Sequence, residues 1–298
     1  MYQTGSSTLL KASYRQPSHG PNMVQVAELN ASHEREVMDF LARRPIHTVG
    51  MVGLINDNGL VSPFNRGTFY GCRNLQGQLE GVALIGHATL METTSDRALE
   101  ALAQIAQTCT TGHMIMGEQE RMNEFWDYYA EAGQHMRRAC REQLFELRWP
   151  VEAQVEVPSL RLATAADLEL IIPIQAEMAF DESGVNPLER DPEGFRRRCA
   201  RRIEQGRTWV SVEGGKLIFK AEIVADTSQV IYLEGIWTKA ERRSQGFGFR
   251  CMSQLARLLL CRTQSICVLV NENNTKAQNF YQRAGYKRRA VYDTIFLQ

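Results

Sequence analysis

The sequence predicts an α/β (α+β) protein with a mixed, mostly antiparallel central sheet flanked by helices, in two domains in tandem. Two observations predict this class. Short runs rich in β-branched residues alternate with helical segments, and the order of the segments in the N-terminal half is echoed in the C-terminal half. In the C-terminal half, Gly214-Gly215 separates two β-rich runs, which is a strong signal of an antiparallel hairpin.

Composition limits the class of protein. The chain has 298 residues, of which 44% are hydrophobic and 23% charged, so it can form two domains, each with its own core. No apolar run can span a bilayer, and residues 1–22 lack the apolar segment of a secretory signal, so we expect a flexible leader. The net charge of zero, without long blocks of like charge, favours neither nucleic acid nor membrane partners. The seven cysteines form no Cys-x-x-Cys pair, so we expect reduced thiols and a cytoplasmic protein.

The N-terminal domain is predicted over residues 23–150. Helices are expected where apolar residues recur at helical spacing, and strands where β-branched residues cluster. Between the strand that ends near residue 90 and the following helix, residues 91–96 offer a Ser/Asp helix cap but no glycine. The expected helices cover residues 35–43, 96–108 and 119–131, and the expected strands cover 48–55, 68–73, 79–90, 113–116 and 143–148.

A charged connector, residues 151–158, leads to a C-terminal domain predicted over residues 159–298. Thr164 followed by Asp167 is typical of a helix start. A polar loop over residues 181–194 precedes an Arg-rich helix, whose charges we expect to be solvated and paired with neighbouring carboxylates. The alternative is that these arginines attract an acidic substrate or a phosphate group. Three strands then form an antiparallel meander. The expected strands cover 160–162, 208–213, 216–225, 230–238 and 266–270, with one more at the C-terminus; the expected helices run from 164 to about 180, over 195–205, after 248 and after 274.

The most informative stretch is the turn that follows the strand ending at Thr238 and contains Gly246 and Gly248. A turn of small residues entering a helix N-terminus offers free backbone N–H groups and the positive end of the helix dipole to an anion. The two glycines let a pyrophosphate approach the main chain. A dinucleotide fingerprint would need a third glycine where Cys251 stands, and no Gly-Lys-Ser/Thr follows, so two common phosphate-binding motifs are excluded.

The remaining pattern resembles the GCN5-related N-acetyltransferase (GNAT) family over residues 158–298. The family's pyrophosphate motif, Arg/Gln-x-x-Gly-x-Gly/Ala, matches Arg243 to Gly248. Its later motif, Asn-x-x-Ala-x-x-aromatic-Tyr, matches Asn274, Ala277, Phe280 and Tyr281, and Gly285-Tyr286 follows. The resemblance implies the acyl-CoA N-acyltransferase fold and acetyl-coenzyme A as cosubstrate, with no metal.

By the same resemblance, the N-terminal half is a degenerate domain of this type. Its turn lacks glycine, and the carboxylates of Glu92 and Asp96 would repel a pyrophosphate, so we expect it to have lost the cofactor. The alternative is an unrelated α+β domain.

In the resembling family, the strand before the turn offers its backbone edge to the pantetheine arm of the cofactor. Here that strand ends with Ile236, Trp237 and Thr238. The amides that follow, together with the Arg243 side chain, would hold the pyrophosphate. Asn274 is first of all a helix cap. The predicted cofactor-binding residues are Ile236, Trp237, Thr238, Arg243, Ser244, Gln245, Gly246, Phe247, Gly248, Phe249, Asn271 and Asn274.

The family uses a tyrosine at the position of Tyr281 to protonate the departing coenzyme A thiolate. A thiol of pKa about 8.5 and a tyrosine of pKa about 10 leave this transfer uphill by about 2 kcal/mol. A helix N-terminus and a shielded site could supply that amount. The alternative is that Tyr281 is a buried packing residue.

The substrate amine also needs a base, because an amine of pKa about 10.4 is neutral only about 0.04% of the time at pH 7, a penalty of about 4.6 kcal/mol. All six histidines lie in the N-terminal half, so we expect a carboxylate. Glu234 is the first choice and Glu222 the second; for each, a solvated position on the meander is the alternative.

The sequence thus predicts an N-acetyltransferase in which a neutral primary amine attacks the thioester directly. Two alternatives stay open: a coenzyme A-binding sensor without catalysis, and a transferase that moves a longer acyl chain. The acceptor, which could be a small molecule or a protein amine, and the oligomeric state, a dimer included, are not specified by the sequence.

Overall fold

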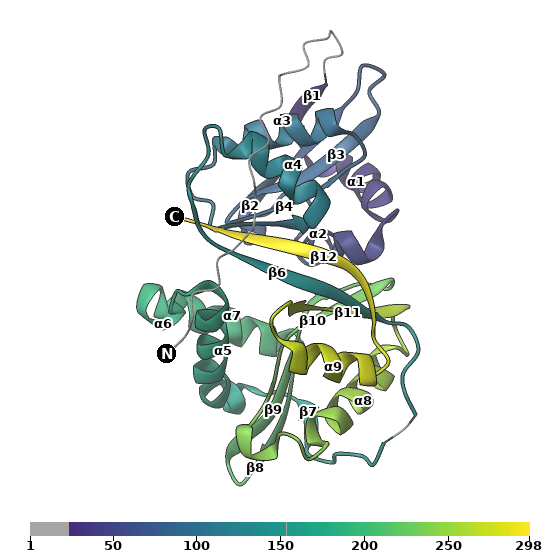
Figure 1. The fold of residues 1–298 in the computed structure, drawn as a ribbon, viewed down its shortest axis with the longest axis vertical. Helices are drawn as coiled ribbons and strands as arrows, with labels where there is room; N and C mark the ends of the chain where they lie inside the picture. Colours follow the sequence, from purple (N-terminus) through teal and green to yellow (C-terminus); the bar gives the residue numbers. More distant parts are fainter. Residues whose placement is uncertain (1–23, 153) are drawn as a thin grey trace. The chain divides into compact units, whose positions relative to one another are not determined.

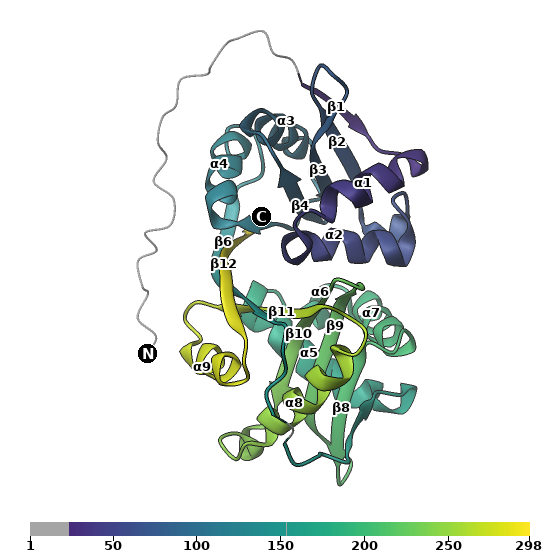
Figure 2. The same cartoon turned by 90° about the vertical axis from the view of Figure 1, so that its right-hand side faces the viewer.

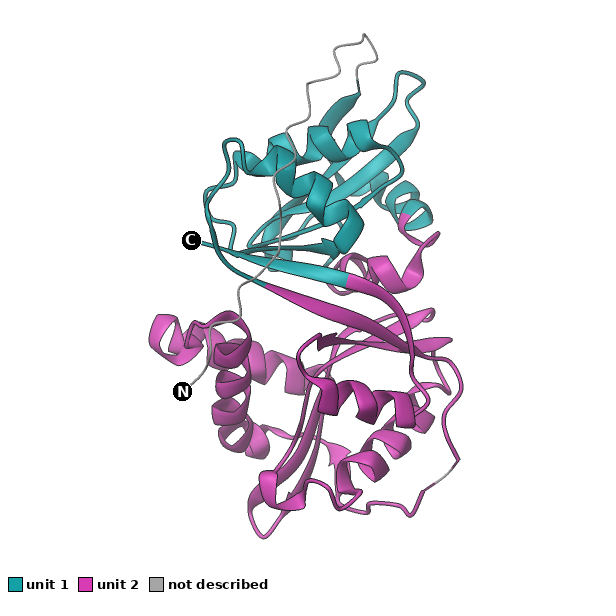
Figure 3. Ribbon diagram, viewed as in Figure 1, with its two compact units in different colours: residues 1–40, 58–139, 292–298 teal, residues 41–57, 140–291 magenta. Residues whose placement is uncertain are grey.

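The computed structural model describes residues 24–152 and 154–298, so the expected leader, residues 1–22, lies outside the described residues. The chain forms two compact units (Figure 3). Unit 1 takes the chain up to Phe40, then Asn58–Ala139 and Tyr292–Gln298. Unit 2 takes Leu41–Asp57 and Cys140–Val291. The units therefore differ from the predicted ranges 23–150 and 159–298, since each contains a segment from the other half of the chain.

Unit 1 is a sheet in the order β1-β2-β3-β4-β5-β12, antiparallel except for the parallel pair β4 and β5. Its largest apolar core lies between this sheet and helices α3 and α4. The strands are β1 (Gln25–Glu28), β2 (Gly67–Arg73), β3 (Leu79–Gly86), β4 (Ala88–Thr93), β5 (Met114–Glu118) and β12 (Lys287–Leu297), and the helices are α1 (Glu34–Leu41), α3 (Asp96–Gln107) and α4 (Gln119–Tyr129). The boundary between the units falls within β12, so only its part from Tyr292 onward belongs to unit 1.

Unit 2 is a sheet in the order β6-β11-β10-β9-β8-β7, with β10 and β11 parallel. Helices α8 and α9 cover one face, and α5 and α7 cover the other (Figures 1 and 2). The strands are β6 (Met136–Leu147), β7 (Leu160–Leu162), β8 (Thr208–Glu213), β9 (Lys216–Asp226), β10 (Val230–Thr238) and β11 (Ser265–Asn271), and the helices are α2 (Pro45–Asn58), α5 (Leu168–Ser183), α6 (Pro187–Arg190), α7 (Pro192–Glu204), α8 (Phe247–Leu259) and α9 (Thr275–Arg283).

The predicted strand over residues 48–55 is wrong, because this segment lies inside helix α2. Pro45 is the first residue of the helix, where proline is favoured because no backbone N–H is needed there. No residue from 44 to 55 is exposed, so the apolar run lacks the one-sided pattern that marks a surface helix. Gly53 faces β9 so closely that a Cβ there would lie 2.5 Å from the Cβ of Ala225.

Two smaller predictions also need correction. The single strand expected over 79–90 is two strands, β3 and β4, with a break at His87. The polar loop expected over 181–194 contains the end of α5, the short helix α6 and the start of α7. Asn186 and Asp191 cap α6 and α7 by accepting backbone N–H groups, and a proline follows each cap.

The start of α5 is confirmed as a capped turn. The Asp167 carboxylate accepts the Thr164 backbone N–H at 2.8 Å and both Nη atoms of Arg161, at 2.7 and 2.9 Å. This bonding holds the pKa of Asp167 at about 2, chiefly because the Arg161 guanidinium donates to it. Within residues 24–152 and 154–298, no helix is both long and apolar enough to pass through a membrane.

Candidate active site

The site begins where β10 and β11 separate. The two strands pair in parallel over three residues, from Val230 with Ser265 to Tyr232 with Cys267, and their register ends there. Beyond that point β10 continues alongside β9 to Thr238, whereas β11 continues alongside β6 to Asn271. The edge of β10 after Tyr232 therefore opens away from its parallel neighbour, and it leads directly to the glycine turn.

A β-bulge lies in the open part of β10. Glu234 pairs with Glu222 and Trp237 pairs with Lys220, so β10 holds one more residue than β9 between these pairs. Gly235 occupies the bulge with φ of 60°, a left-handed conformation that favours glycine. A bulge redirects the peptide groups of a strand, so it sets which backbone groups face the opening.

The turn after β10 has the backbone of an anion cradle. Ser244 and Gly246 have positive φ, 59° and 72°, and α8 begins at Phe247 with no side chain capping it. Gly248 fits because a Cβ there would lie 2.8 Å from the Thr238 Oγ1 atom. The first-turn N–H groups of α8 have no acceptor within the helix, so they can donate to a bound anion.

Arginines surround this turn. The predicted Arg243 lies against it but donates its Nε to the Thr238 carbonyl at 2.7 Å. Arg242 bonds both Glu213 oxygens, at 3.0 and 3.1 Å, and its guanidinium lies 4.8 Å from the centre of the Phe247 ring. Arg250 also lies over this ring, at 5.8 Å. The sequence analysis did not select Arg250, although its position four residues after Gly246, on the first turn of α8, could have indicated it.

The remaining predicted cofactor residues lie on β10, in the glycine turn, on the first turn of α8, and between the end of β11 and α9. Ile236, Phe249 and Phe280 pack against the core on the α8–α9 side, whereas Trp237 packs on the α5 side. Asn271 accepts the Asn273 N–H at 2.9 Å. Gln245 donates its side-chain amide to the Glu241 carbonyl at 2.8 Å. Asn274 is confirmed as the cap of α9, since its Oδ1 accepts the Ala277 N–H at 3.0 Å.

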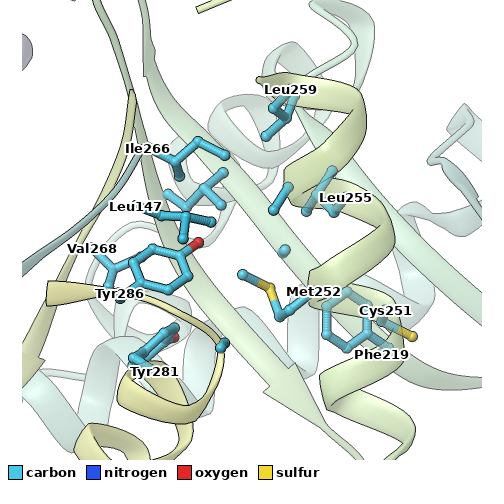
Figure 4. Packing of buried hydrophobic residues seen from close by; sticks show 14 of the residues in the cluster. Leu147, Phe219, Cys251, Met252, Leu255, Leu259, Ile266, Val268, Tyr281 and Tyr286 are labelled. Atoms are coloured by element: carbon cyan, nitrogen blue, oxygen red, sulfur yellow. The ribbon is translucent and has the colours of Figure 1, made fainter. Parts of the chain in front are cut away.

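Tyr281 lies within the buried core between the sheet and helices α8 and α9 (Figure 4). It is 7% exposed, and its ring contacts those of Phe145, Phe280 and Tyr286. Burial raises the pKa of Tyr281, so the phenol stays protonated but is a weaker acid than in water. The position therefore satisfies the packing alternative, and the acid role stays a prediction.

The two carboxylates considered as bases have opposite environments. Glu234 is exposed on β10, and its carboxylate accepts a hydrogen bond from the hydroxyl group of buried Tyr232 at 3.1 Å. Glu222 is only 3% exposed, and its oxygens contact the Nζ of Lys220 and the Nη1 of Arg202, each at 3.2 Å. Glu222 is thus already compensated by two cations, whereas Glu234 has a solvent-facing carboxylate.

Lys220 is a site residue that the sequence analysis missed. It is fully buried, and its Nζ donates to the Gly235 carbonyl of the bulge at 2.9 Å and to the Oε1 of Gln175 on α5. Burial lowers the pKa of Lys220, and the neighbouring Glu222 carboxylate opposes that shift. The only signal in the sequence is a charged residue inside an otherwise apolar run of a strand, Leu217 to Ala221.

A cavity of about 550 Å³ lies on the α5 side of the same region. It is lined by apolar residues, among them Ile174, Leu217 and Trp237, and by residues of both charges, among them Glu177 and Arg243. Within the described residues, no group of three or more His, Cys, Asp or Glu side chains is placed to hold a metal ion.

Comparisons with known proteins agree with this geometry. Residues 174–286 match the family model described as Acetyltransferase (GNAT) family. The fold is similar to a GNAT-family acetyltransferase from Colwellia psychrerythraea (TM-score 0.59, 12% identity, 93% of this chain and 100% of that one). It is also similar to a GCN5-related N-acetyltransferase from Sphaerobacter thermophilus (0.59, 12%, 92% and 95%). A tandem GNAT protein from the clavulanic acid biosynthesis pathway is a third (0.55, 12%, 92% and 98%). No curated protein matches the sequence. These folds confirm the predicted class and its two tandem domains.

Proposed function

We propose that the protein is an acetyl-coenzyme A-dependent N-acetyltransferase that acts on a primary amine, because residues 174–286 match the GNAT acetyltransferase family model. The observation that carries the proposal is the open edge of β10, which runs past a bulge into the uncapped start of α8. An extended arm with a pyrophosphate at one end matches this arrangement, because the strand edge offers hydrogen bonds and the helix start offers an anion site.

Acetyl-coenzyme A, when bound, would supply an activated acyl thioester whose leaving group is the coenzyme A thiolate. The chain's own residues would do the rest. Backbone N–H groups of residues 244–249 would hold the pyrophosphate, and the edge from Ile236 to Thr238 would hold the arm. Asn271, whose side chain orders the loop after β11, would border the opening on the opposite strand.

Glu234 is the better candidate for the base. A base must reach the amine, directly or through water, and Glu234 is exposed at the point where β10 and β11 separate. Glu222 lies opposite it on β9 but is buried between Lys220 and Arg202. To accept a proton from the amine, Glu222 would have to give up its ion pairs with two cations, which costs more than protonating the solvated carboxylate of Glu234. We therefore assign Glu222 a structural role.

Tyr281 remains our candidate for the acid that protonates the leaving thiolate. Its burial near the end of α9 keeps it fully protonated, which a proton donor requires, although the raised pKa makes the transfer harder. This same burial favours one alternative function, a coenzyme A-binding sensor without catalysis, in which Tyr281 only packs. The second alternative, a transferase of a longer acyl chain, would bind the coenzyme A part of its cosubstrate through the same residues.

We further propose that unit 2 alone binds the cofactor and that unit 1 does not. The seven cysteines are all free thiols, which suits the cytoplasmic location that we propose. The acceptor class and the oligomeric state do not follow from these observations.

The test is release of coenzyme A from acetyl-coenzyme A with a panel of amines: a polyamine, an aminoglycoside, amino acids and a peptide with a free N-terminus and lysine. We expect turnover with at least one, and about a 100-fold lower turnover for Glu234→Gln, the low end of the range for general-base loss. Glu204→Gln, at an exposed position on α7, is the matched control. Binding without turnover across the panel would favour the sensor, and turnover only with longer acyl thioesters would favour the second alternative.

A further inference from the structure

Lys220 is unusual because a fully buried lysine is costly unless its charge is compensated. Here three oxygen-bearing partners surround the ammonium group. Its Nζ contacts the Gly235 carbonyl, the Gln175 side-chain oxygen and the Glu222 carboxylate. Glu222 in turn contacts Arg202 on α7. The lysine therefore ties the bulge of β10 to α5, and through Glu222 to α7.

The contact with Gly235 fixes the direction of one peptide group. The Gly235 carbonyl points to Lys220, whose Nζ also contacts Gln175 on α5 and the Glu222 carboxylate. In a trans peptide the C=O and the N–H point in opposite directions, and no cis peptide occurs in the described chain. The N–H of Ile236 therefore points away from Lys220, and the Ile236 side chain packs with the α8–α9 core.

Lys220 also acts on the strength of this N–H group. A cation that donates to a carbonyl polarises the whole peptide unit, which makes its N–H a better donor. Gly235 allows this close approach, since a Cβ at that position would lie 2.7 Å from the Lys220 Nζ. Lys220 thus affects both the direction and the donor strength of the Ile236 N–H group.

We propose that Lys220 is a positioning residue that aims and polarises the Ile236 N–H toward the carbonyl oxygen of the bound acyl thioester. The inference rests on the proposed function, because it needs the thioester to lie along the open edge of β10. Gln175 and the buried Glu222 hold the ammonium in place, and Glu222 is itself contacted by Arg202. Lys220 itself touches neither the thioester nor the amine.

The test is infrared difference spectroscopy of acetyl-coenzyme A labelled with ¹³C at the thioester carbonyl, which needs no acceptor amine. A hydrogen bond to the carbonyl lowers its stretching frequency. We expect a clear downshift on binding to the wild-type protein and loss of most of that shift in Lys220→Met. Affinity by calorimetry should change by less than about threefold, because the pyrophosphate grip is separate. Lys287→Met, at an exposed lysine of β12, is the matched control and should behave as wild type.

The outcomes separate this inference from the proposed function. If the wild-type protein binds no acetyl-coenzyme A, the proposed function fails. If it binds with a downshift that Lys220→Met retains, the role of Lys220 is overturned and the function stands. Should Lys220→Met fail to fold, Gln175→Ala decides, because it keeps the lysine and removes one partner. A smaller downshift in Gln175→Ala then supports the positioning role, and an unchanged downshift overturns it.

Discussion

Unit 1 and unit 2 each contain a strand that pairs in parallel with its neighbour over three residues and then enters a turn and a helix. In unit 2 these are β10 and α8, and in unit 1 they are β4 and α3. The β4 pairing ends at Leu90 with Met116, and three further residues of β4 precede the turn. The backbone plan is thus the same, and the difference lies in the side chains of the two turns.

The turn of unit 1 is filled by its own polar groups. The Ser95 hydroxyl accepts the Ala98 N–H at 3.2 Å, so one first-turn amide of α3 is already used. The Ser95 hydroxyl also donates to Glu80 at 2.8 Å, and Arg121 donates to Asp96 at 2.7 Å. At the start of α8 a glycine stands where the cap would be. The comparison teaches that the same backbone plan leaves the first-turn amides of the helix open only where no side chain caps them, as in α8 and not in α3.

The largest expected effect is loss of cofactor binding in Gly246→Asp. Aspartate at a φ of 72° is strained by about 1–2 kcal/mol, and its charge would oppose a pyrophosphate. We expect acetyl-coenzyme A affinity by calorimetry to fall at least about 100-fold. Thr94→Asp adds the same charge to the exposed turn of unit 1 and should leave binding unchanged. Retained binding in Gly246→Asp would place the pyrophosphate elsewhere and break the comparison.

Tyr281→Phe should come next, with turnover reduced about 100-fold and acetyl-coenzyme A affinity little changed, because a proton donor acts late in the reaction. Unit 1 offers a matched control at the same place in its fold. Tyr129 ends α4, is buried, and accepts the Gln134 N–H at 3.2 Å. Tyr129→Phe should alter stability but not turnover. A turnover of Tyr281→Phe within about twofold of wild type would mean that Tyr281 only packs.

The smallest effect concerns a feature that both units share, a short 3₁₀ turn that precedes α1 in unit 1 and α5 in unit 2. In unit 1, Asn30 donates its N–H to the His33 Nδ1 at 3.0 Å, and in unit 2, Thr164 donates to Asp167. Asp167→Asn should lower the free energy of unfolding by about 1–3 kcal/mol at pH 7, because it removes the charge that Arg161 binds.

This contribution depends on pH in a defined direction. The pKa of Asp167 is about 2 in the folded protein, below the usual value of about 3.9 in an unfolded chain. The stabilisation is therefore complete above pH 4 and is lost as the pH falls toward 2. Denaturant unfolding of both proteins from pH 7 to pH 2 checks this, and a difference that stays constant down to pH 2 would contradict it.

Much of unit 2 could be predicted because its signals are local. Gly214-Gly215 marks the β8–β9 hairpin, Thr164 and Asp167 start α5, and Gly246 and Gly248 mark the anion turn. Each works through the few residues around it, so one sequence is enough. Helix α2 was missed for the opposite reason. Its residues are buried on several sides, and a continuous apolar run fits a buried helix and a buried strand equally well.

The site itself divides in the same way. Arg243, the glycine turn, Asn274 and Tyr281 were selected from their spacing along the chain, and their roles in binding and catalysis stay predictions. Lys220 was missed, because its role depends on three partners that are distant in sequence: Gln175, Glu222 and the Gly235 carbonyl. No motif in the sequence favours Glu234 over Glu222 as the predicted base, and only their different burial in the structure gives a physical reason to prefer Glu234.

The sequence by itself determined the class of fold, the meander and the position of the glycine turn, since these follow from periodicity and from residues with special backbone freedom. Only the tertiary structure decided which strands β6 and β12 pair with. β6 of the N-terminal half pairs with β11 in unit 2, and β12 of the C-terminal half pairs with β5 in unit 1. Strands pair through backbone groups that every residue carries, so a strand's own residues do not name its partner.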